Sequence, residues 1–365
     1  MMDAGQMHPE FMGGFPGGDR FVLRIVPPAS VARRGVILCI QPFLDEATLA
    51  RRVLAEQARR LATEGWVTWI PDLFGTGDSP GDTAQAKLEI WRNELIQWAD
   101  RARTSVPDGP LVLWGTRMGA VLAAQLSGDT PLPHHLLFWQ APPDGQALIG
   151  PLRKLNRLRS ATQAGGEEQP PDSPVRPTLD AQTDTGATEP LAGYQLDARL
   201  LQGLDTLSCT PRGTVEGNVA RHALFLNTQR LVRDGQSPPA PLMQRVEQWQ
   251  LAGWQVQASL AAGEPFWSSM EPSTPIACFD QTQAWLRSLP AVDGNAAQPS
   301  AGLVEGRLPW VIAEAQVSKG VTERPVLMLG EQGPMIGVLS LPAAAAKRDG
   351  AQPAALIVPG QPQTR

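Results

Sequence analysis

Short apolar runs alternate along this chain with longer segments in which apolar residues recur at helical spacing. Residues 34–40 form a continuous apolar run of the kind that is buried on both faces of a parallel sheet. Residues 47–65 carry Leu49, Val53, Ala58 and Leu61 on one helical face and end at Gly65. Strands that alternate with helices of this length predict a right-handed, mostly parallel α/β sheet. The predicted strands are residues 21–26, 34–40, 66–70, 111–114, 135–139, 221–227 and 254–260, and the predicted helices are residues 47–65, 88–103, 191–207, 240–253 and 275–289.

Four segments differ in composition from this alternating part, which we place at 21–289 as one domain. Residues 1–20 are rich in Gly, Met and Pro and predict a flexible arm. Residues 160–190 contain almost no large apolar side chain and predict a disordered, mobile insertion in the region where a cap is usual. Residues 290–322 predict a linker of small residues.

The tail, residues 323–365, holds three strand candidates with no helix between them. These are residues 324–329, 335–341 and 354–358. A sheet start without its crossover helices cannot bury both of its faces. We therefore expect this piece to be unstable by itself or to dock on another surface. Its strand pattern predicts the truncated start of a second α/β domain.

The most informative stretch is residues 111–125, where an apolar run meets a Gly-x-x-x-Gly turn and continues as an Ala/Leu-rich helix. This strand–turn–helix pattern is typical of the nucleophile elbow of α/β-hydrolases, Gly-x-Ser-x-Gly. Gly115 and Gly119 are present, as a sharp turn with close packing requires. The middle position is Arg117, between Thr116 and Met118, so the expected serine is absent. An α/β-hydrolase-like fold is thus predicted without its usual nucleophile.

Composition and charge exclude several other classes of protein. The 365 residues carry a net charge of −5, so nothing favours nucleic-acid binding. Three cysteines lie far apart without a Cys-x-x-Cys pair, which argues against a metal site or disulfides and fits a reducing cytoplasm. No signal-peptide pattern and no apolar run of roughly 20 residues is present, so we expect a cytoplasmic protein without a membrane span. No feature of the sequence indicates a cofactor.

A serine hydrolase also needs a histidine after its last strand. In this chain that loop is Gly263-Glu-Pro-Phe-Trp267 and contains none. The four histidines, His8, His134, His135 and His222, are all expected elsewhere. With Arg117 in place of the nucleophile, two of three triad members are missing, and the catalytic residues stay unknown. An ordinary Ser-His-Asp mechanism is not expected.

The carboxyl ends of the predicted parallel strands should meet in one crevice and bring charged side chains together there. Arg117 with Glu264 is the preferred pair, because they replace the nucleophile and the histidine. An arginine fork there would hold a small molecule with an anionic group. The alternative is a buried ion pair that closes an inactive crevice. The candidate crevice residues are Phe43, Asp45, Glu46, Asp78, Arg117 and Glu264, with Phe266 and Trp267 in the histidine-slot loop.

Other residue types near the crevice have structural interpretations. Cys39 lies inside an apolar strand and should be inert. Asp72 and Ser79 belong to a glycine-rich loop that we interpret as a structural turn. Arg51 and Arg52 are expected on a solvated helix face, and Trp267 is expected to line a pocket. The core tryptophans are expected to be Trp66, Trp69, Trp91, Trp98, Trp114 and Trp139.

Four motifs in a fixed order resemble one known family. They are Gln-Pro-Phe-Leu-Asp-Glu-Ala-Thr-Leu-Ala-Arg-Arg at 41–52, Pro-Asp-Leu-Phe-Gly-Thr-Gly-Asp-Ser-Pro-Gly-Asp at 71–82, Leu-Trp-Gly-Thr-Arg-Met-Gly at 113–119 and Gly-Glu-Pro-Phe-Trp at 263–267. Over roughly residues 20–289 the chain is similar to the exosortase A system-associated hydrolases of type 2.

This resemblance implies an α/β-hydrolase-like fold and a role in bacterial exopolysaccharide production and PEP-CTERM protein sorting. It also implies that an elbow without serine is usual in the family, so that Arg117 would be a family trait. The tail is similar to the start of the type 1 hydrolase of the same system, although Gln361 follows Gly360 where a second glycine is expected.

Two functional hypotheses remain open. The protein is either a hydrolase that uses a non-serine mechanism, as the resemblance implies, or a catalytically inactive homologue that binds a ligand or a pathway partner. The fold alone does not decide between them.

Overall fold

The computed structural model describes residues 5–158, 187–214 and 220–290 in full and residues 159–164, 315–318, 321–330 and 333–342 as backbone. The chain divides into two compact units, Met1–Val304 and Glu305–Arg365. Each unit is described by itself.

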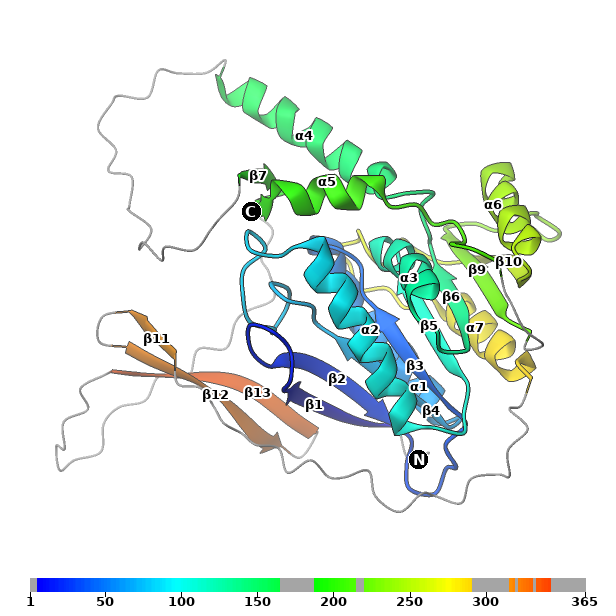
Figure 1. Cartoon of the computed structure of the whole chain (residues 1–365), viewed down its shortest axis with the longest axis horizontal. Coiled ribbons are helices and arrows are strands. Elements are labelled where there is room, and N and C mark those ends of the chain that lie inside the picture. Colours follow the sequence, from blue (N-terminus) through cyan, green and yellow to red (C-terminus); the bar gives the residue numbers. More distant parts are fainter. Residues whose placement is uncertain are drawn as a thin grey trace. The chain divides into compact units, whose positions relative to one another are not determined.

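The first unit is built on an eight-stranded sheet with the order β1-β2-β4-β3-β5-β6-β9-β10 (Figure 1). β2 runs antiparallel to both of its neighbours, and every other pair is parallel. The predicted fold class, a mostly parallel sheet flanked by helices, is confirmed. The strands are β1 (Gln6–Met12), β2 (Arg20–Val26), β3 (Gly35–Ile40), β4 (Trp66–Pro71), β5 (Leu111–Thr116), β6 (His134–Trp139), β9 (His222–Gln229) and β10 (Gln255–Ala262).

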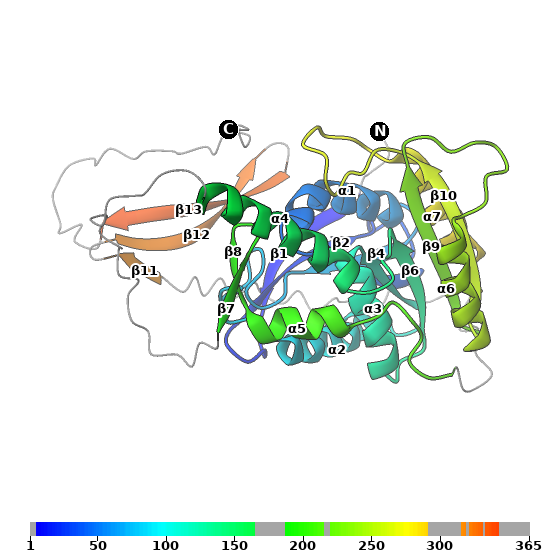
Figure 2. The same cartoon turned by 90° about the horizontal axis from the view of Figure 1, so that it is seen from above.

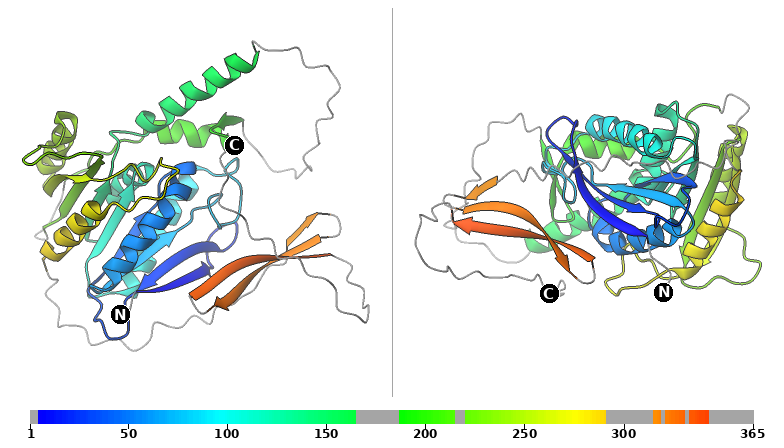
Figure 3. Two further views of the ribbon diagram at one scale, coloured as in Figure 1. Left: turned by 180° about the vertical axis from the view of Figure 1, so that it is seen from behind. Right: turned by 90° about the horizontal axis from the view of Figure 1, so that it is seen from below.

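Helices cover both faces of this sheet, as Figure 1 and the view from behind in Figure 3 show. α1 (Asp45–Ala62) and α7 (Ile276–Ser288) pack on one face, and α2 (Leu88–Ser105), α3 (Met118–Asp129) and α6 (Ala240–Leu251) pack on the other. Strand residues alternate between the two cores, since Leu38 faces α2 and α3 whereas Cys39 faces α1. All six expected core tryptophans are buried.

A small cap region lies over the carboxyl edge of the sheet (Figure 2). It contains α4 (Gln146–Ala164), the hairpin of β7 (Thr188–Leu191) and β8 (Tyr194–Asp197), and α5 (Ala198–Thr206). The predicted helix over 191–207 is therefore wrong in its first half. Ala192 and Gly193 have φ of 52° and 89° and close the hairpin, and the Asp197 carboxylate caps α5 by accepting from the Arg199 and Leu200 amides. The predicted disordered insertion over 160–190 is wrong at both ends, which lie in α4 and β7, and residues 165–186 are outside the described residues.

The predicted flexible arm over 1–20 is wrong for residues 5–20, which contain β1 and a turn packed on α2. Phe15 lies 4.8 Å from the Trp98 ring centroid. Arg20 is fully buried and donates to Glu94 at 2.7 Å and to the carbonyls of Pro16 and Gly18 at 2.6 Å. These donations from one buried guanidinium anchor a segment whose composition alone suggested disorder.

The second unit contains a three-stranded antiparallel sheet of β11 (Ala315–Ser318), β12 (Val321–Gly330) and β13 (Gly333–Pro342). The strands predicted at 324–329 and 335–341 lie within β12 and β13, whereas the one at 354–358 is outside the described residues. The linker predicted over 290–322 is wrong where it overlaps β11 and the start of β12.

Among the described residues, no helix is both long and apolar enough to cross a membrane.

Candidate functional site

The turn between β5 and α3 has the geometry of a nucleophile elbow. Arg117 adopts φ 57° and ψ −119°, a strained conformation for a residue with a side chain, and its amide donates to the Trp139 carbonyl at 3.0 Å. A Cβ atom at Gly115 would lie 2.3 Å from the Gly119 carbonyl oxygen, and one at Gly119 would lie 2.0 Å from the Ile40 carbonyl oxygen. Only glycine fits at these two positions, because β5, α3 and the end of β3 approach so closely.

The Arg117 side chain is held by Glu46 in the first turn of α1. Its Nη2 donates to Glu46 Oε1 at 2.7 Å, and its Nε lies 3.1 Å from both carboxylate oxygens. Its Cζ also lies 5.3 Å from the centroid of the Trp267 ring. Arg117 is therefore fixed between a carboxylate and an aromatic face.

The expected pairing of Arg117 with Glu264 is wrong. Glu264 is an exposed residue that accepts from Arg230 Nε at 2.7 Å. α1 begins at Asp45, after β3, and Glu46 in its acidic first turn bonds Arg117 in place of Glu264.

The loop in the histidine slot fills the corner beside the elbow with aromatic rings. Phe266 and Trp267 are both buried, and their ring centroids lie 5.1 Å apart. Phe266 also packs edge-on against Trp139. Trp267 contacts Arg117 and is not among the residues that line the cavity described below.

All four histidines lie away from the elbow. His134 and His135 begin β6 and His222 begins β9, so they occupy the amino edge of the parallel strands, and His8 is on β1. His134 Nε2 lies 2.7 Å from Ser127 Oγ, but both residues are buried and far from the carboxyl edge. Burial lowers the pKa of His134 and of His135 to about 4, so both rings are neutral near pH 7.

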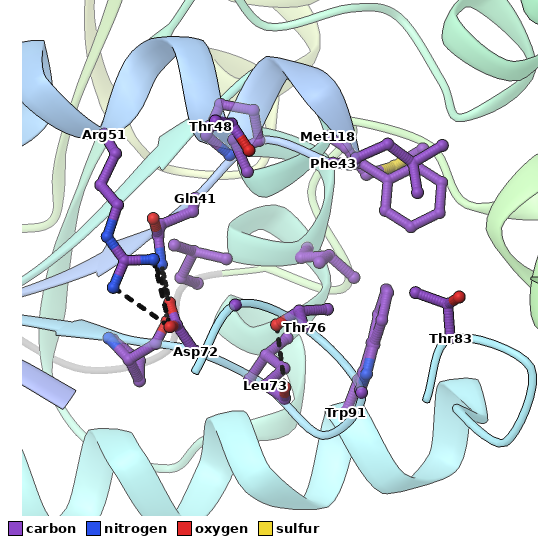
Figure 4. Close-up of a pocket in the computed structure, with 18 of the residues that line it drawn as sticks. Gln41, Phe43, Thr48, Arg51, Asp72, Leu73, Thr76, Thr83, Trp91 and Met118 are labelled. Atoms are coloured by element: carbon purple, nitrogen blue, oxygen red, sulfur yellow. Dashed lines mark hydrogen bonds and ion pairs between the residues drawn. The ribbon is translucent and has the colours of Figure 1, made fainter. Parts of the chain in front are cut away.

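A cavity of about 360 Å³ opens next to the elbow (Figure 4). It lies between the loop after β3, the loop after β4 and α1, and Tyr194 of the cap hairpin is part of its wall. Two of the candidate crevice residues, Phe43 and Asp78, line it, together with Met118 of the elbow turn. The apolar wall includes Ile40, Phe43, Leu73, Trp91, Leu95, Met118 and Leu122, and the polar wall includes Gln41, Thr48, Arg51, Asp72, Thr76, Asp78, Thr83 and Tyr194.

The polar wall is organised around the buried carboxylate of Asp72. Asp72 accepts from Gln41 Nε2 at 2.7 Å, from both terminal nitrogens of Arg51 at 3.1–3.2 Å and from the Asp78 amide at 2.8 Å. Arg51 was expected on a solvated face, but α1 turns it towards the loop after β4, where it meets this carboxylate (Figure 4). Arg52 is exposed and pairs with Glu56 one turn away, in agreement with the prediction.

The loop after β4 is a structural turn, as predicted. Ser79 Oγ donates to the Asp72 carbonyl at 2.6 Å and accepts from the Phe21 amide at 2.9 Å. Gly77 has φ +54°, and a Cβ there would lie 2.1 Å from Asp72 Oδ2. The glycine therefore lets the backbone close around the carboxylate.

The cap hairpin joins the cavity rim through two hydrogen bonds that the sequence did not reveal. Tyr194, the single tyrosine of the chain, donates its hydroxyl to Asp45 at 2.8 Å. Thr83 Oγ1 donates to the Gln195 carbonyl at 2.8 Å. The candidate crevice residue Asp45 therefore lies at the rim of the cavity, where it bonds Tyr194. Tyr194 belongs to the part of the cap that was expected to be helical.

Metal or thiol chemistry finds no support in the part of the chain that the structure describes. No group of three or more His, Cys, Asp or Glu side chains converges there. Cys39 is fully buried, and desolvation raises its pKa well above the usual value, as expected for an inert thiol.

One family model matches part of the chain. The model for serine aminopeptidase S33 matches residues 50–164, from α1 to the end of α4. This segment contains the elbow, and the strand pairs around the elbow are parallel, as in the predicted fold class. The chain has an α/β-hydrolase fold.

Several solved structures are similar to this α/β-hydrolase-fold chain at low identity. DcsB in complex with its substrate analogue is 14% identical, with a TM-score of 0.48, and the match covers 77% of this chain and 99% of that one. Est1E from Butyrivibrio proteoclasticus is 12% identical with a TM-score of 0.47, covering 76% and 97%. A soluble variant of monoglyceride lipase from Saccharomyces cerevisiae is 11% identical with a TM-score of 0.48, covering 78% and 96%. No curated protein matches the sequence.

Proposed function

We propose that this protein is a non-hydrolytic α/β-hydrolase homologue that binds a small molecule in the cavity beside its elbow. The observation that carries the proposal is the state of Arg117, which occupies the nucleophile position and is held by Glu46 and Trp267. A guanidinium stays protonated and cannot attack an acyl carbon. The cavity nevertheless persists, so the architecture supports binding without acyl transfer.

The groups around the cavity support the same proposal. No serine, cysteine or histidine is among the lining residues that the structure describes. A hydroxyl nucleophile needs an adjacent base. The imidazoles of His134, His135 and His222 lie at the opposite edge of the sheet, and His8 lies on the outermost strand, β1. The alternative of a hydrolase with a non-serine mechanism follows from the sequence resemblance and the match to a hydrolase model.

The test is reaction with a fluorophosphonate probe together with a panel of ester substrates, on wild type, Arg117→Ala and Arg230→Ala. Arg230 is a matched control, since it is an exposed arginine paired with Glu264 outside the cavity. We expect no labelling and no turnover above the buffer rate in any of the three. Labelling of wild type, or turnover that is lost in Arg117→Ala and kept in Arg230→Ala, would overturn the proposal.

We further propose that the protein acts in the cytoplasm, in the exosortase-associated pathway linked to exopolysaccharide. The support is the sequence resemblance over roughly residues 20–289. Deletion of the gene should change exopolysaccharide output, and complementation with Arg117→Ala should restore it if no reaction occurs at the elbow. Unchanged output after deletion would contradict the pathway assignment.

A further inference from the structure

The polar wall of the cavity offers hydrogen-bond acceptors and few donors. The hydroxyls of Thr76, Thr83 and Tyr194 already donate to the Leu73 carbonyl, the Gln195 carbonyl and Asp45, each at 2.8 Å. What these hydroxyls still present to a ligand is their lone pairs. The Thr48 hydroxyl, for which the described residues provide no acceptor, remains a donor, so a molecule in the cavity must supply most of the donors.

Gln41 also presents an acceptor and no donor to the cavity. Its amide nitrogen donates to the Pro71 carbonyl at 3.0 Å and to Asp72 at 2.7 Å, and Figure 4 shows the side chain beside that carboxylate. Its Oε1 is buried and has no hydrogen-bond partner among the described residues. Both amide hydrogens of Gln41 are thus used within the protein, so this side chain offers no donor to a molecule in the cavity.

The charge of the wall is negative. The terminal nitrogens of Arg51 bond both Asp72 and Asp78, so one guanidinium faces two carboxylates and one negative charge is left over. The excess charge is at the mouth, where the Asp78 side chain is 60% exposed while that of Asp72 is 2% exposed. Partial desolvation raises the pKa of Asp78; Arg51 opposes this shift and Asp72 adds to it. An anion at the mouth would be repelled, whereas a cation would compensate the charge.

The inner part of the cavity is apolar and aromatic. Phe43 and Trp91 meet edge to face with ring centroids 5.8 Å apart, and Met118 and Leu122 complete this part of the wall. The cavity volume lies within the usual range for small-molecule sites, roughly 300–1,000 Å³. The site thus combines an anionic mouth with an apolar interior.

We infer that the cavity binds a primary amine with an apolar body, whose ammonium group lies at Asp78 and whose apolar part lies against Phe43 and Trp91. This inference rests on the proposed binding function and names the ligand class of the same cavity. It reverses the sign of the ligand charge expected from Arg117, because that arginine is committed to Glu46 and does not line the cavity.

The experiment compares three probes of equal chain length, octylamine, octanol and octanoate, by calorimetric titration and thermal shift at pH 7.5 and below their micellar concentrations. We expect octylamine to raise Tm and to bind about tenfold or more tightly than octanoate, with octanol between them. Octanoate binding as tightly as octylamine, or no binding of any probe, would overturn the inference.

Two variants make the result specific to the mouth. Asp78→Asn should weaken octylamine binding about tenfold and leave octanol binding unchanged, because it removes charge and keeps the backbone amide that supports Asp72. Asp234→Asn, a change at an exposed acid outside the cavity lining, should alter neither. An unchanged octylamine affinity in Asp78→Asn would contradict the inference.

The two proposals fail separately. Ester turnover would overturn the non-hydrolytic function and leave the amine preference intact. A preference for octanoate would overturn the amine assignment and leave the non-hydrolytic function intact.

Discussion

Two arginine–carboxylate clusters at the carboxyl edge of the sheet contain residues of α1. In the elbow cluster, Glu46 of α1 holds Arg117 against Trp267. In the wall cluster, Arg51 of α1 holds Asp72 and reaches Asp78. The first cluster occupies the corner where a nucleophile and a histidine would meet, whereas the second borders an open cavity.

The difference lies in the charge balance of the two clusters. At the elbow one guanidinium meets one carboxylate, so the pair is neutral, and Nε and Nη2 of Arg117 both donate to Glu46. At the wall one guanidinium serves two carboxylates and leaves a negative charge at the mouth. α1 therefore neutralises Arg117 at the elbow through Glu46, whereas at the cavity its Arg51 only partly neutralises Asp72 and Asp78.

The largest expected effect is acid unfolding, which sets the pH range in which the two clusters can be compared. The pKa of His134 and of His135 is about 4 in the fold against 6.5 when unfolded, so both are neutral in the fold and take up protons on unfolding. The contribution of the two imidazoles to the free energy of unfolding is fully present above pH 6.5. It falls between pH 6.5 and 4, by about 3 kcal/mol for each imidazole.

Urea unfolding across this pH range is the measurement. A double variant, His134→Asn with His135→Asn, should start less stable and show a much flatter pH dependence. An equally steep fall in that variant would show that other groups cause the acid sensitivity.

The wall cluster should give the next largest effect. Asp72→Ala removes a buried carboxylate, so the Gln41 and Asp78 donors lose their acceptor and the stability of the fold falls by about 3 kcal/mol. Denaturant midpoints at pH 7.5 measure this loss, with Asp234→Ala as an exposed control of near-zero effect. A loss of stability smaller than the coupling energy of the elbow pair would contradict this order, because the wall cluster would then contribute less to the stability of the fold than the elbow cluster.

The elbow pair should give the smallest effect. Arg117 and Glu46 are 20% and 27% exposed, so solvent weakens their attraction and a double-mutant cycle with Arg117→Met and Glu46→Gln should give a coupling of about 1 kcal/mol or less. A coupling as large as the Asp72→Ala loss would mean that the elbow pair carries much of the stability of the carboxyl edge.

The fold was largely predictable because the apolar pattern records which strands are buried on both faces. Residues 34–40 and 111–114 contain continuous apolar runs, and both coincide with central parallel strands. The errors fall where one tertiary contact overrides local composition. Arg20 anchors a segment that resembles an arm, and the Ala192–Gly193 turn makes a hairpin of a segment that resembles a helix.

The site was predictable only in part. The spacing of Gly115 and Gly119 identified the elbow, because a close approach of backbones excludes every larger residue. The partner of Arg117 was not predictable, because Glu46 and Glu264 are equivalent in a linear pattern and only the path of α1 favours one of them. Tyr194 and Trp91 were missed as cavity residues, since a pocket wall drawn from distant segments leaves no local signature.

The sequence by itself determined the sheet, the elbow turn and the absence of serine from it, because these follow from the apolar pattern and from residue identity at fixed spacing. Only the tertiary structure decided which carboxylate neutralises Arg117 and which carboxylates surround Arg51. Charge balance depends on distances of a few ångströms between segments far apart in the chain, and those distances are set when α1 packs between the elbow and the loop after β4.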